Sequence, residues 1–234
     1  SEEQAGYTSL VQEMTDAIHA ALPGGQMSVD VAWSSNGIDG RNYDYAAVGK
    51  AADLLFIMAY DEMSQIWDEP CSARANSGLE MAMEGVESYL SLGIPKNKLV
   101  LGLPWYGYRY TCIQYFQNNN TCVIEKVEFQ GAPCSDAAGR QFTYAYIKNL
   151  MNEKNITQVW ENDTATPYYN YEDPSVSDGT IQMRYDNPHS LKIKIDYAMN
   201  LGLLGAGMWN ANSLDPSDSA YAILQRAEMW GVMP

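Results

Sequence analysis

Tyr60 and Asp61 are the residues of this chain that most directly suggest chemistry, because they follow a short and wholly apolar run. That run, Leu54–Met58, is too short to cross a membrane and is typical of a strand buried on both faces. In a parallel sheet covered by helices, the carboxyl ends of the strands face the crevice where ligands bind. A phenol and a carboxylate at this point are candidate functional groups, and a core tyrosine followed by a turn is the structural alternative.

Three further apolar runs also end in aromatic or amide side chains. Strands predicted over residues 26–33, 98–104 and 203–210 end at Trp33, at Trp105 with Tyr106, and at Trp209 with Asn210. Aromatic rings stack on the C–H faces of sugar rings, and nearby Asp and Asn side chains can bond hydroxyl or amide groups. One such aromatic residue is more often part of a core than of a ligand platform, but four at one rim favour a carbohydrate site.

The elements that must position these residues alternate between helix and strand. Helices are expected over residues 1–22, 43–50, 78–92 and 187–202 and from Asp215 to about Trp230, with core faces that include Leu10, Met14, Leu191, Ile195, Ala198 and Met199. Four βα units with right-handed crossovers are half of a (β/α)8 TIM barrel. The sequence therefore predicts an α/β fold, with residues 1–108 and 187–234 as the two parts of the carboxyl-terminal half of a barrel.

Residues 109–186 break this rhythm and are rich in Cys, Asn, Gly, Pro and Tyr. One helix near residues 143–152 and short strands near 157–160, 167–171 and 180–185 predict a small α+β insertion subdomain. Half a barrel leaves two sheet edges with unpaired backbone groups. A further polypeptide, the missing amino-terminal half of the barrel, is therefore an expected partner.

Composition limits the other partners. The chain has 234 residues, 46% of them hydrophobic, and a formal net charge of −15, which argues against nucleic acid because phosphate binding needs clustered Lys and Arg. No apolar run approaches the roughly 20 residues that span a bilayer, so no membrane association is expected. The chain begins with Ser1 rather than Met, which predicts a processed product or a piece of a longer protein.

Four cysteines favour disulfides over a metal site. Cys71, Cys112, Cys122 and Cys134 lack zinc-ligand spacing with His19 or His189, so neither a metal nor another cofactor is expected. Of the possible pairings, Cys112 with Cys122 is preferred because a short loop could close as a hairpin, which leaves Cys71 with Cys134. Glycosylation triplets begin at Asn119, Asn155 and Asn162. Together these features predict a lysosomal or secreted protein.

At its strand ends the chain resembles the family 18 glycoside hydrolases, the chitinase-like TIM barrels. Met58-Ala-Tyr60-Asp61 is similar to the Met-X-Tyr-Asp strand of that family, and Gly102-Leu-Pro104-Trp-Tyr106-Gly107 is similar to its Gly-X-Pro-X-Tyr-Gly motif. Tyr185–Ser190 and Gly207–Trp209 resemble the start of its closing helix and its last strand. The resemblance runs nearly end to end and also accounts for the insertion.

The resemblance implies roles for single residues. Tyr60 would hydrogen-bond the acetamido carbonyl of the substrate, Asp61 would belong to the acidic network near the catalytic acid, and Trp209 would form the floor of the sugar pocket. The remaining substrate-binding candidates are Met58, Trp105, Tyr106 and Asn210. In this family the 2-acetamido oxygen of the substrate attacks the anomeric carbon, so no enzyme nucleophile is needed.

The resemblance further implies a substrate. The most similar branch of the family removes N-acetylglucosamine from the di-N-acetylchitobiose core of N-glycans by retaining hydrolysis of a β-1,4 linkage, so an oligosaccharide containing N-acetylglucosamine is the expected ligand. The alternative is a non-catalytic chitin-binding lectin of the same barrel. The retention of both Tyr60 and Asp61 favours the enzyme.

Two departures from the family pattern qualify this prediction. The family's proton donor is the last Glu of an Asp-X-X-Asp-X-Asp-X-Glu motif, which does not occur in this sequence, and Glu2 and Glu3 do not match its position. The chain is therefore expected to be inactive by itself. The second departure is Tyr108, which stands where chitinases commonly have Arg and puts the binding of extended chitin chains in doubt.

Overall fold

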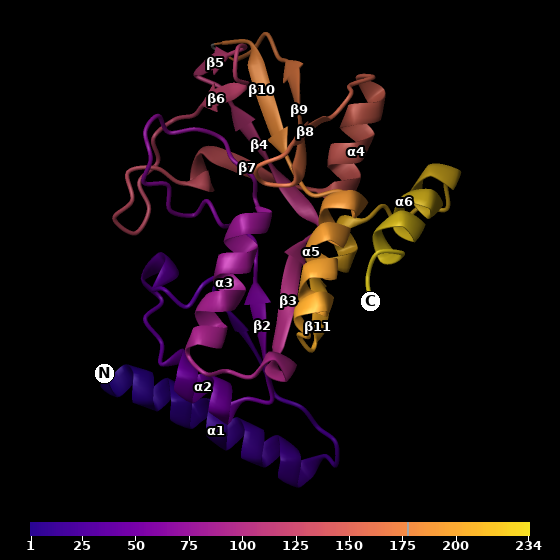
Figure 1. Ribbon diagram of the computed structural model, residues 1–234. Coiled ribbons are helices and arrows are strands. Elements are labelled where there is room, and N and C mark those ends of the chain that lie inside the picture. Colours follow the sequence, from indigo (N-terminus) through magenta and orange to yellow (C-terminus); the bar gives the residue numbers. More distant parts are fainter. Residues whose placement is uncertain (177) are drawn as a thin grey trace.

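Four parallel strands form the sheet that organises the molecule (Figure 1). A computed structural model describes residues 1–176 and 178–234. In spatial order the strands are β1 (Ser28–Val31), β2 (Leu54–Met58), β3 (Leu99–Pro104) and β11 (Gly205–Trp209), and every neighbouring pair is parallel. The predicted α/β class and the four predicted strands are confirmed. Within the described residues the sheet does not close into a barrel, and β1 and β11 are its edges.

Helices that follow the strands pack beside this sheet. They are α2 (Tyr45–Ala51), α3 (Leu79–Ser91) and α5 (Pro188–Leu201), and α3 contacts α5 (Figure 1). The predicted start of α5 is confirmed, because the Asn187 side chain accepts a hydrogen bond from the Ser190 N–H at 2.9 Å. Gly202, in the left-handed region at φ 82°, ends the helix. Trp33 lies against α3, where a Cβ added to Gly85 would come 2.0 Å from its carbonyl oxygen.

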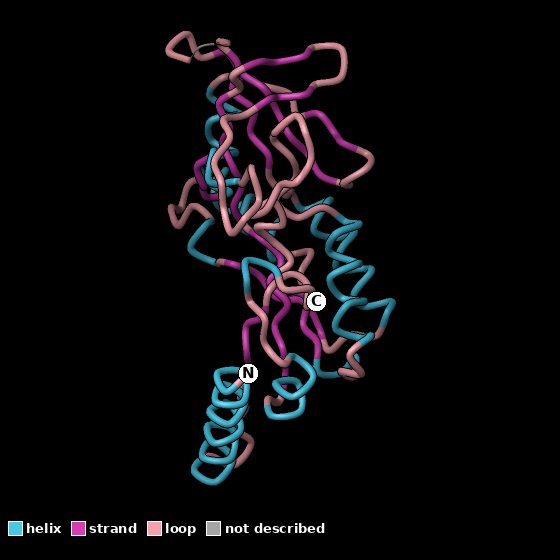
Figure 2. The backbone as a smooth tube through the Cα atoms, turned by 90° about the vertical axis from the view of Figure 1, so that its left-hand side faces the viewer, coloured by secondary structure: helices cyan, strands magenta, loops and turns pink. Residues whose placement is uncertain are grey.

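The amino-terminal helix α1 (Glu2–Ala21) buries a different face from the one that its sequence predicts. Leu10 and Met14 are 53% and 43% exposed, whereas Val11 and Thr15 are buried. The helix lies across the amino-terminal ends of the strands and packs on α2, so only one narrow stripe is covered (Figures 1 and 2). The prediction that Leu10 and Met14 belong to the core is wrong, and so is that for Met199, which is 46% exposed.

The insertion forms a second sheet beyond the carboxyl ends of the parallel strands (Figure 1). Its antiparallel strands, in order, are β7 (Gly139–Thr143), β4 (Tyr106–Thr111), β10 (Thr180–Arg184), β9 (Thr166–Glu172) and β8 (Val159–Glu161). Helix α4 (Tyr144–Glu153) and a hairpin of β5 (Gln114–Phe116) and β6 (Thr121–Val123) complete it. The predicted helix and the three later strands are confirmed. Because β4 begins at Tyr106, this sheet starts almost directly after β3.

The last helix, α6 (Ala220–Trp230), begins later than predicted. The Ser219 hydroxyl accepts the hydrogen bond from the Ala222 N–H and caps the helix. Asp215, the predicted start, instead accepts a hydrogen bond from the Ser217 N–H two residues on, and so forms a turn before the helix. Short 3-10 turns lie at Ile38–Gly40, Lys96–Lys98, Asp136–Ala138 and Ala211–Ser213. No helix in the described ranges is long and apolar enough to cross a membrane.

Two glycines in the Gly102–Gly107 stretch sit where the backbone is closely approached. A Cβ added at Gly107 would lie 2.2 Å from the Arg184 carbonyl oxygen, and one at Gly102 would lie 2.2 Å from the Phe56 ring. Real Cβ atoms essentially never come so close. Glycine at 107 therefore allows β4 to approach the backbone at the end of β10.

Gly107→Ala is expected to lower the free energy of unfolding by about 2 kcal/mol or more, because a backbone carbonyl cannot move aside without disturbing the ladder between β4 and β10. The matched control is Gly205→Ala in β11, where nothing lies within 4 Å of an added Cβ. Urea unfolding of both variants measures the difference. Equal midpoints for the two variants would contradict the close approach at residue 107.

Candidate functional site

One carboxylate oxygen joins the two sheets at the predicted site. Asp61 Oδ1 accepts a hydrogen bond from the Tyr106 hydroxyl at 2.6 Å and another from the Tyr108 hydroxyl at 2.9 Å. Alternate residues of a strand point to the same face, so β4 presents both phenols to the end of β2. Among the described residues, Asp61 Oδ2 has no protein hydrogen bond of its own. The carboxylate is thus fixed through one oxygen and available through the other.

Tyr60 completes this group and remains a hydrogen-bond donor. Its ring meets the Tyr106 ring edge to face, with centroids 5.9 Å apart, and it is 7% exposed. Burial raises the pKa of the Tyr60 phenol, and the negative charges of Asp30 and Asp61 raise it further. Burial followed by the Asp61 charge likewise raises the pKa of Tyr106. These phenols are therefore protonated at any physiological pH and can donate to a carbonyl oxygen.

The backbone at Asp61 adopts an uncommon conformation that its neighbours hold in place. Asp61 has φ 52°, in the left-handed region. Its N–H donates to the Asn76 side-chain oxygen at 2.8 Å, and the Glu62 N–H donates to the Asn76 carbonyl at 3.2 Å. Asn76 thereby turns the chain so that the Asp61 carboxylate faces β4 while Glu62 points into the interior.

Tyr108 and two residues of the insertion were not given a role from the sequence. Gln141 donates from Nε2 to the Tyr108 oxygen at 2.8 Å, and the Asp136 N–H donates to the Met63 carbonyl at 2.8 Å. Burial raises the pKa of the Asp136 carboxyl to about 7, with a further contribution from the charge of Asp61. The alternation of tyrosines from residue 106 to 110 was the signal in the sequence that could have indicated Tyr108.

Disulfides hold the loop after Asp61 against the insertion. The pairs Cys71–Cys134 and Cys112–Cys122 confirm the preferred pairing, with Cα atoms 6.0 and 5.0 Å apart. The Ile66 N–H also donates to the Cys134 carbonyl at 2.8 Å. The first pair joins positions separated by 63 residues, so it removes much of the freedom with which the loop could move away from Tyr108.

A buried group of charges lies directly behind the site. Glu62, Asp186 and Lys194 are at most 1% exposed, and the Lys194 ammonium bonds Asp186 Oδ1. The Gly78 N–H donates to Glu62 Oε2 at 2.5 Å. Burial raises the pKa of the Glu62 carboxyl well above its usual value, which the positive charge of Lys194 only partly offsets. Burial therefore favours the protonated form of Glu62, next to a lysine whose charge Asp186 balances.

Of the remaining predicted site residues, Met58 packs against the cluster that contains Tyr60, Tyr106 and Tyr108, whereas Trp105, Trp209 and Asn210 make other contacts. Met58 ends β2 and lines a small cavity with Asp30. Trp105 is fully buried and packs edge to face on Trp230, with centroids 4.9 Å apart. At the carboxyl end of β11, Trp209 is 52% exposed and accepts a hydrogen bond through its carbonyl from the Trp105 N–H. The next residue, Asn210, accepts a hydrogen bond from the Ser213 hydroxyl at 2.9 Å.

The predicted glycosylation positions are accessible. Asn119, Asn155 and Asn162 are all exposed and all lie in the insertion, at turns between its elements. Their occupancy stays a prediction. Among residues 1–176 and 178–234, no group of three or more His, Cys, Asp or Glu side chains could hold a metal ion.

Lys194→Met is expected to destabilise the protein by roughly 3–5 kcal/mol, because it leaves Asp186 buried without its counter-charge. Lys192→Met on the same helix is the matched control. That lysine is exposed and pairs with Asp196, so its loss should change stability by about 0.5 kcal/mol or less. Denaturant unfolding at pH 7 measures both variants. Similar effects from the two substitutions would show that the buried charge group does not carry this energy.

Asp136→Asn is expected to flatten the dependence of stability on pH. Because the pKa of Asp136 rises from 3.8 to about 7 on folding, its contribution is fully present below about pH 4 and is lost as the pH rises through 7. The variant should therefore gain stability relative to the unmodified chain at pH 8 and little at pH 4. Urea midpoints across this range, with exposed Asp163→Asn as control, test the effect. Parallel curves for Asp136→Asn and the unmodified chain would rule it out.

Comparison with known proteins identifies the family of this chain. A family model described as Glycosyl hydrolases family 18 matches residues 1–214. Over 234 residues the chain is 47% identical to the di-N-acetylchitobiases of Rattus norvegicus and Homo sapiens. The match includes all of this chain, which spans 62% and 60% of the length of those two relatives.

Solved structures show the same fold. The class V chitinase of Nicotiana tobaccum superposes with a TM-score of 0.72 at 21% identity, over 97% of this chain and 64% of that one. A chitinase of Chromobacterium violaceum gives 0.72 at 19% identity, over 99% of this chain and 61% of that one. With the family model matching most of its length, the chain belongs to glycosyl hydrolase family 18.

Proposed function

We propose that this chain is part of a glycoside hydrolase of the chitobiase type, which cleaves the β-1,4 linkage between the N-acetylglucosamine residues of the di-N-acetylchitobiose core of N-glycans. The observation that carries the proposal is the arrangement at Asp61. Its carboxylate accepts hydrogen bonds from two phenols of β4, and the Tyr60 hydroxyl beside it remains free to donate. The identity of 47% to di-N-acetylchitobiases over 234 residues supports the choice of substrate.

The geometry suits a reaction in which the substrate supplies its own nucleophile. The Tyr60 hydroxyl would donate to the acetamido group of the sugar and hold it below the anomeric carbon, an effect of orientation. The bond from the acetamido oxygen to the anomeric carbon forms as the bond to the leaving oxygen breaks, an acid protonates that oxygen, and water later reopens the ring. Asp61 Oδ2, free of protein donors among the described residues, would face the acid and the acetamido N–H.

A second polypeptide segment completes the site in this proposal. Within residues 1–176 and 178–234, the edge strands β1 and β11 each lack a neighbour on one side. Apolar side chains such as Leu10 on α1, Leu204 and Trp209 are about half exposed. Four more βα units would close this half of a TIM barrel and cover those surfaces. The proton donor, which no motif in this sequence provides, would lie on one of the added strands.

The expected compartment is lysosomal or secretory. Two disulfides close among the described cysteines, and such bonds persist in oxidising environments. The exposed glycosylation triplets of the insertion agree with that route. Mass spectrometry of the natural protein would reveal glycans at Asn119, Asn155 or Asn162 if the chain takes it.

The decisive test compares the chain alone with a closed complex, on a chitobiose glycan labelled at its reducing end. Alone, the chain should release no labelled N-acetylglucosamine. Co-folded with the amino-terminal part of the Rattus norvegicus relative, it should turn the substrate over, and Tyr60→Phe in that complex should lower kcat by roughly 10²-fold or more through loss of one oriented donor. Robust turnover by the chain alone would refute the claim that this chain lacks the catalytic acid. Binding by the complex without any turnover would instead support a lectin.

A further inference from the structure

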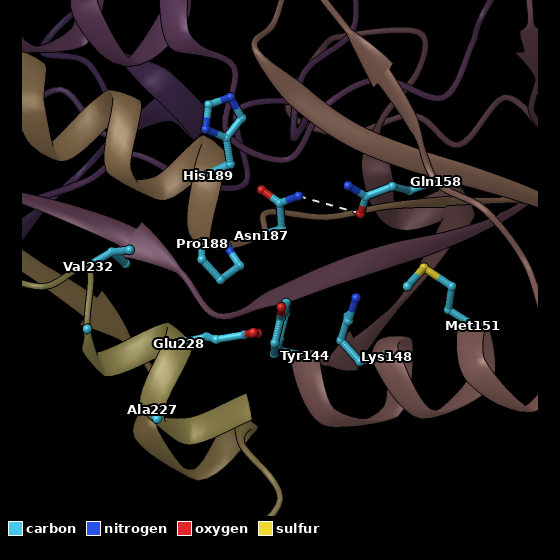
Figure 3. Close-up of a pocket in the computed structure, with 11 residues that line it drawn as sticks. Tyr144, Lys148, Met151, Gln158, Asn187, Pro188, His189, Ala227, Glu228 and Val232 are labelled. Atoms are coloured by element: carbon cyan, nitrogen blue, oxygen red, sulfur yellow. Dashed lines mark hydrogen bonds between the residues drawn. The ribbon is translucent and has the colours of Figure 1, made fainter. Parts of the chain in front are cut away.

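A cavity of about 620 Å³ lies between α4, the amino-terminal end of α5 and α6 (Figure 3). Its volume is in the range of small-molecule sites, and none of its lining residues belongs to the Asp61 group. The side chains with polar atoms that line it are Tyr144, Lys148, Gln158, Asn187, His189 and Glu228. Polar groups thus reach this cavity from α4, α5 and α6, and from Gln158, the residue before β8.

Two amides in this cavity are fixed by the fold. Gln158 Oε1 accepts hydrogen bonds from the Tyr185 hydroxyl at 2.5 Å and from Asn187 Nδ2 at 3.5 Å, the latter drawn as a dashed line in Figure 3. Asn187 is itself held as the cap of α5, because its Oδ1 accepts from the Ser190 N–H. With its oxygen engaged, Gln158 has its Nε2 group left as an oriented donor. Such fixed donors are the part of a binding site that needs no reorganisation when a ligand arrives.

Opposite charges reach the cavity from two helices without pairing. Lys148 extends from α4 toward Asn187 and Gln158, and Glu228 extends from α6 toward Tyr144 (Figure 3). No ion pair or protein hydrogen bond engages the Lys148 ammonium or the Glu228 carboxylate in the described part of the chain. Burial lowers the pKa of Lys148, and the charge of Glu228 acts in the other direction without removing the effect. The ammonium is therefore partly desolvated and lacks a fixed counter-ion.

We propose that this cavity binds a small zwitterion, an α-amino acid with an uncharged side chain. The ligand carboxylate would lie against the Lys148 ammonium and Gln158 Nε2, and the ligand ammonium against the Glu228 carboxylate, which gives charge-assisted hydrogen bonds at both ends. Met151, Pro188 and Val232 provide apolar walls for the side chain. A ligand with both charges satisfies both protein charges at once.

Simpler ligands fit the same groups less well. A plain anion would pair with Lys148 but would meet repulsion from Glu228 across the cavity. A neutral sugar would take water from the partly buried Lys148 ammonium and return no charge to it, which is unfavourable, whereas the exposed Glu228 carboxylate would keep most of its water. The zwitterion thus follows from the unpaired placement of Lys148 and Glu228, and it is independent of the Asp61 site.

The test is a calorimetric titration of the full chain with L-leucine, N-acetyl-L-leucine and L-leucinamide. L-leucine should bind, and the two analogues, each lacking one charge, should bind at least tenfold more weakly. Lys148→Gln and Glu228→Gln should each weaken L-leucine binding at least tenfold. Lys154→Gln and Glu153→Gln, which change neighbouring exposed charges outside this cavity, should leave it unchanged.

Each other outcome overturns the proposal. Equal binding of L-leucine and N-acetyl-L-leucine would indicate an anion site only, and no binding of L-leucine would exclude an amino-acid site. Near-UV circular dichroism reports whether each variant is folded. If a variant does not fold, the comparison of the three ligands on the unmodified chain still decides, because it needs no substitution. The chitobiose glycan, titrated in parallel, separates this cavity from the proposed hydrolase site.

Discussion

The structure depends on a single carboxylate oxygen, Asp61 Oδ1, which connects the two sheets. Asp61 Oδ1 lies at the end of β2 and receives two phenolic protons from β4, so the parallel sheet and the insertion meet at a pair of short hydrogen bonds. Those bonds exist only while the phenols are protonated, and burial raises the pKa of Tyr106 and Tyr108 to ensure it. A group assembled in this way is held from both sheets at once.

Several neighbouring groups fix the position of Asp61, and each restricts a different part of the chain. Asn76 holds the left-handed backbone at Asp61, and glycine at position 107 lets β4 approach β10. Behind Glu62, the interior contains the buried ion pair of Lys194 with Asp186. Buried ion pairs contribute little net stability when compared with apolar packing, but they are costly to disturb once built. The interior behind the site therefore favours one arrangement of the loop rather than a range of them.

Much of this arrangement could be predicted from local patterns. Apolar runs of strand length located β2 and β3, and parallel pairing then placed Tyr60 and Tyr106 at one edge. Caps such as Asn187 and the pairing of Cys112 with Cys122 follow from short-range chemistry, and both are confirmed. The strand runs, the cap and the short disulfide loop share one property, which is that each depends on residues close together in the sequence.

The features that sequence reasoning missed depend on distant contacts. Tyr108, Gln141 and Asp136 meet only because antiparallel strands pair with a register set by tertiary packing. The buried face of α1 depends on which neighbour covers it, and here α1 contacts α2 while Val11 and Thr15 are buried and Leu10 and Met14 stay exposed. Periodicity shows that a helix has an apolar face but does not show how much of that face is covered.

The Cys71–Cys134 bridge has a further consequence for the lifetime of the molecule. Its two ends enclose the exposed turns at β5–β6 and the loop before Ala132, where a protease would most readily cut. After such a cut the fragment with Asp61 and β4 would stay covalently attached to the fragment with β7, α4 and α5. A nicked molecule would thus keep its parts joined after its backbone is no longer continuous.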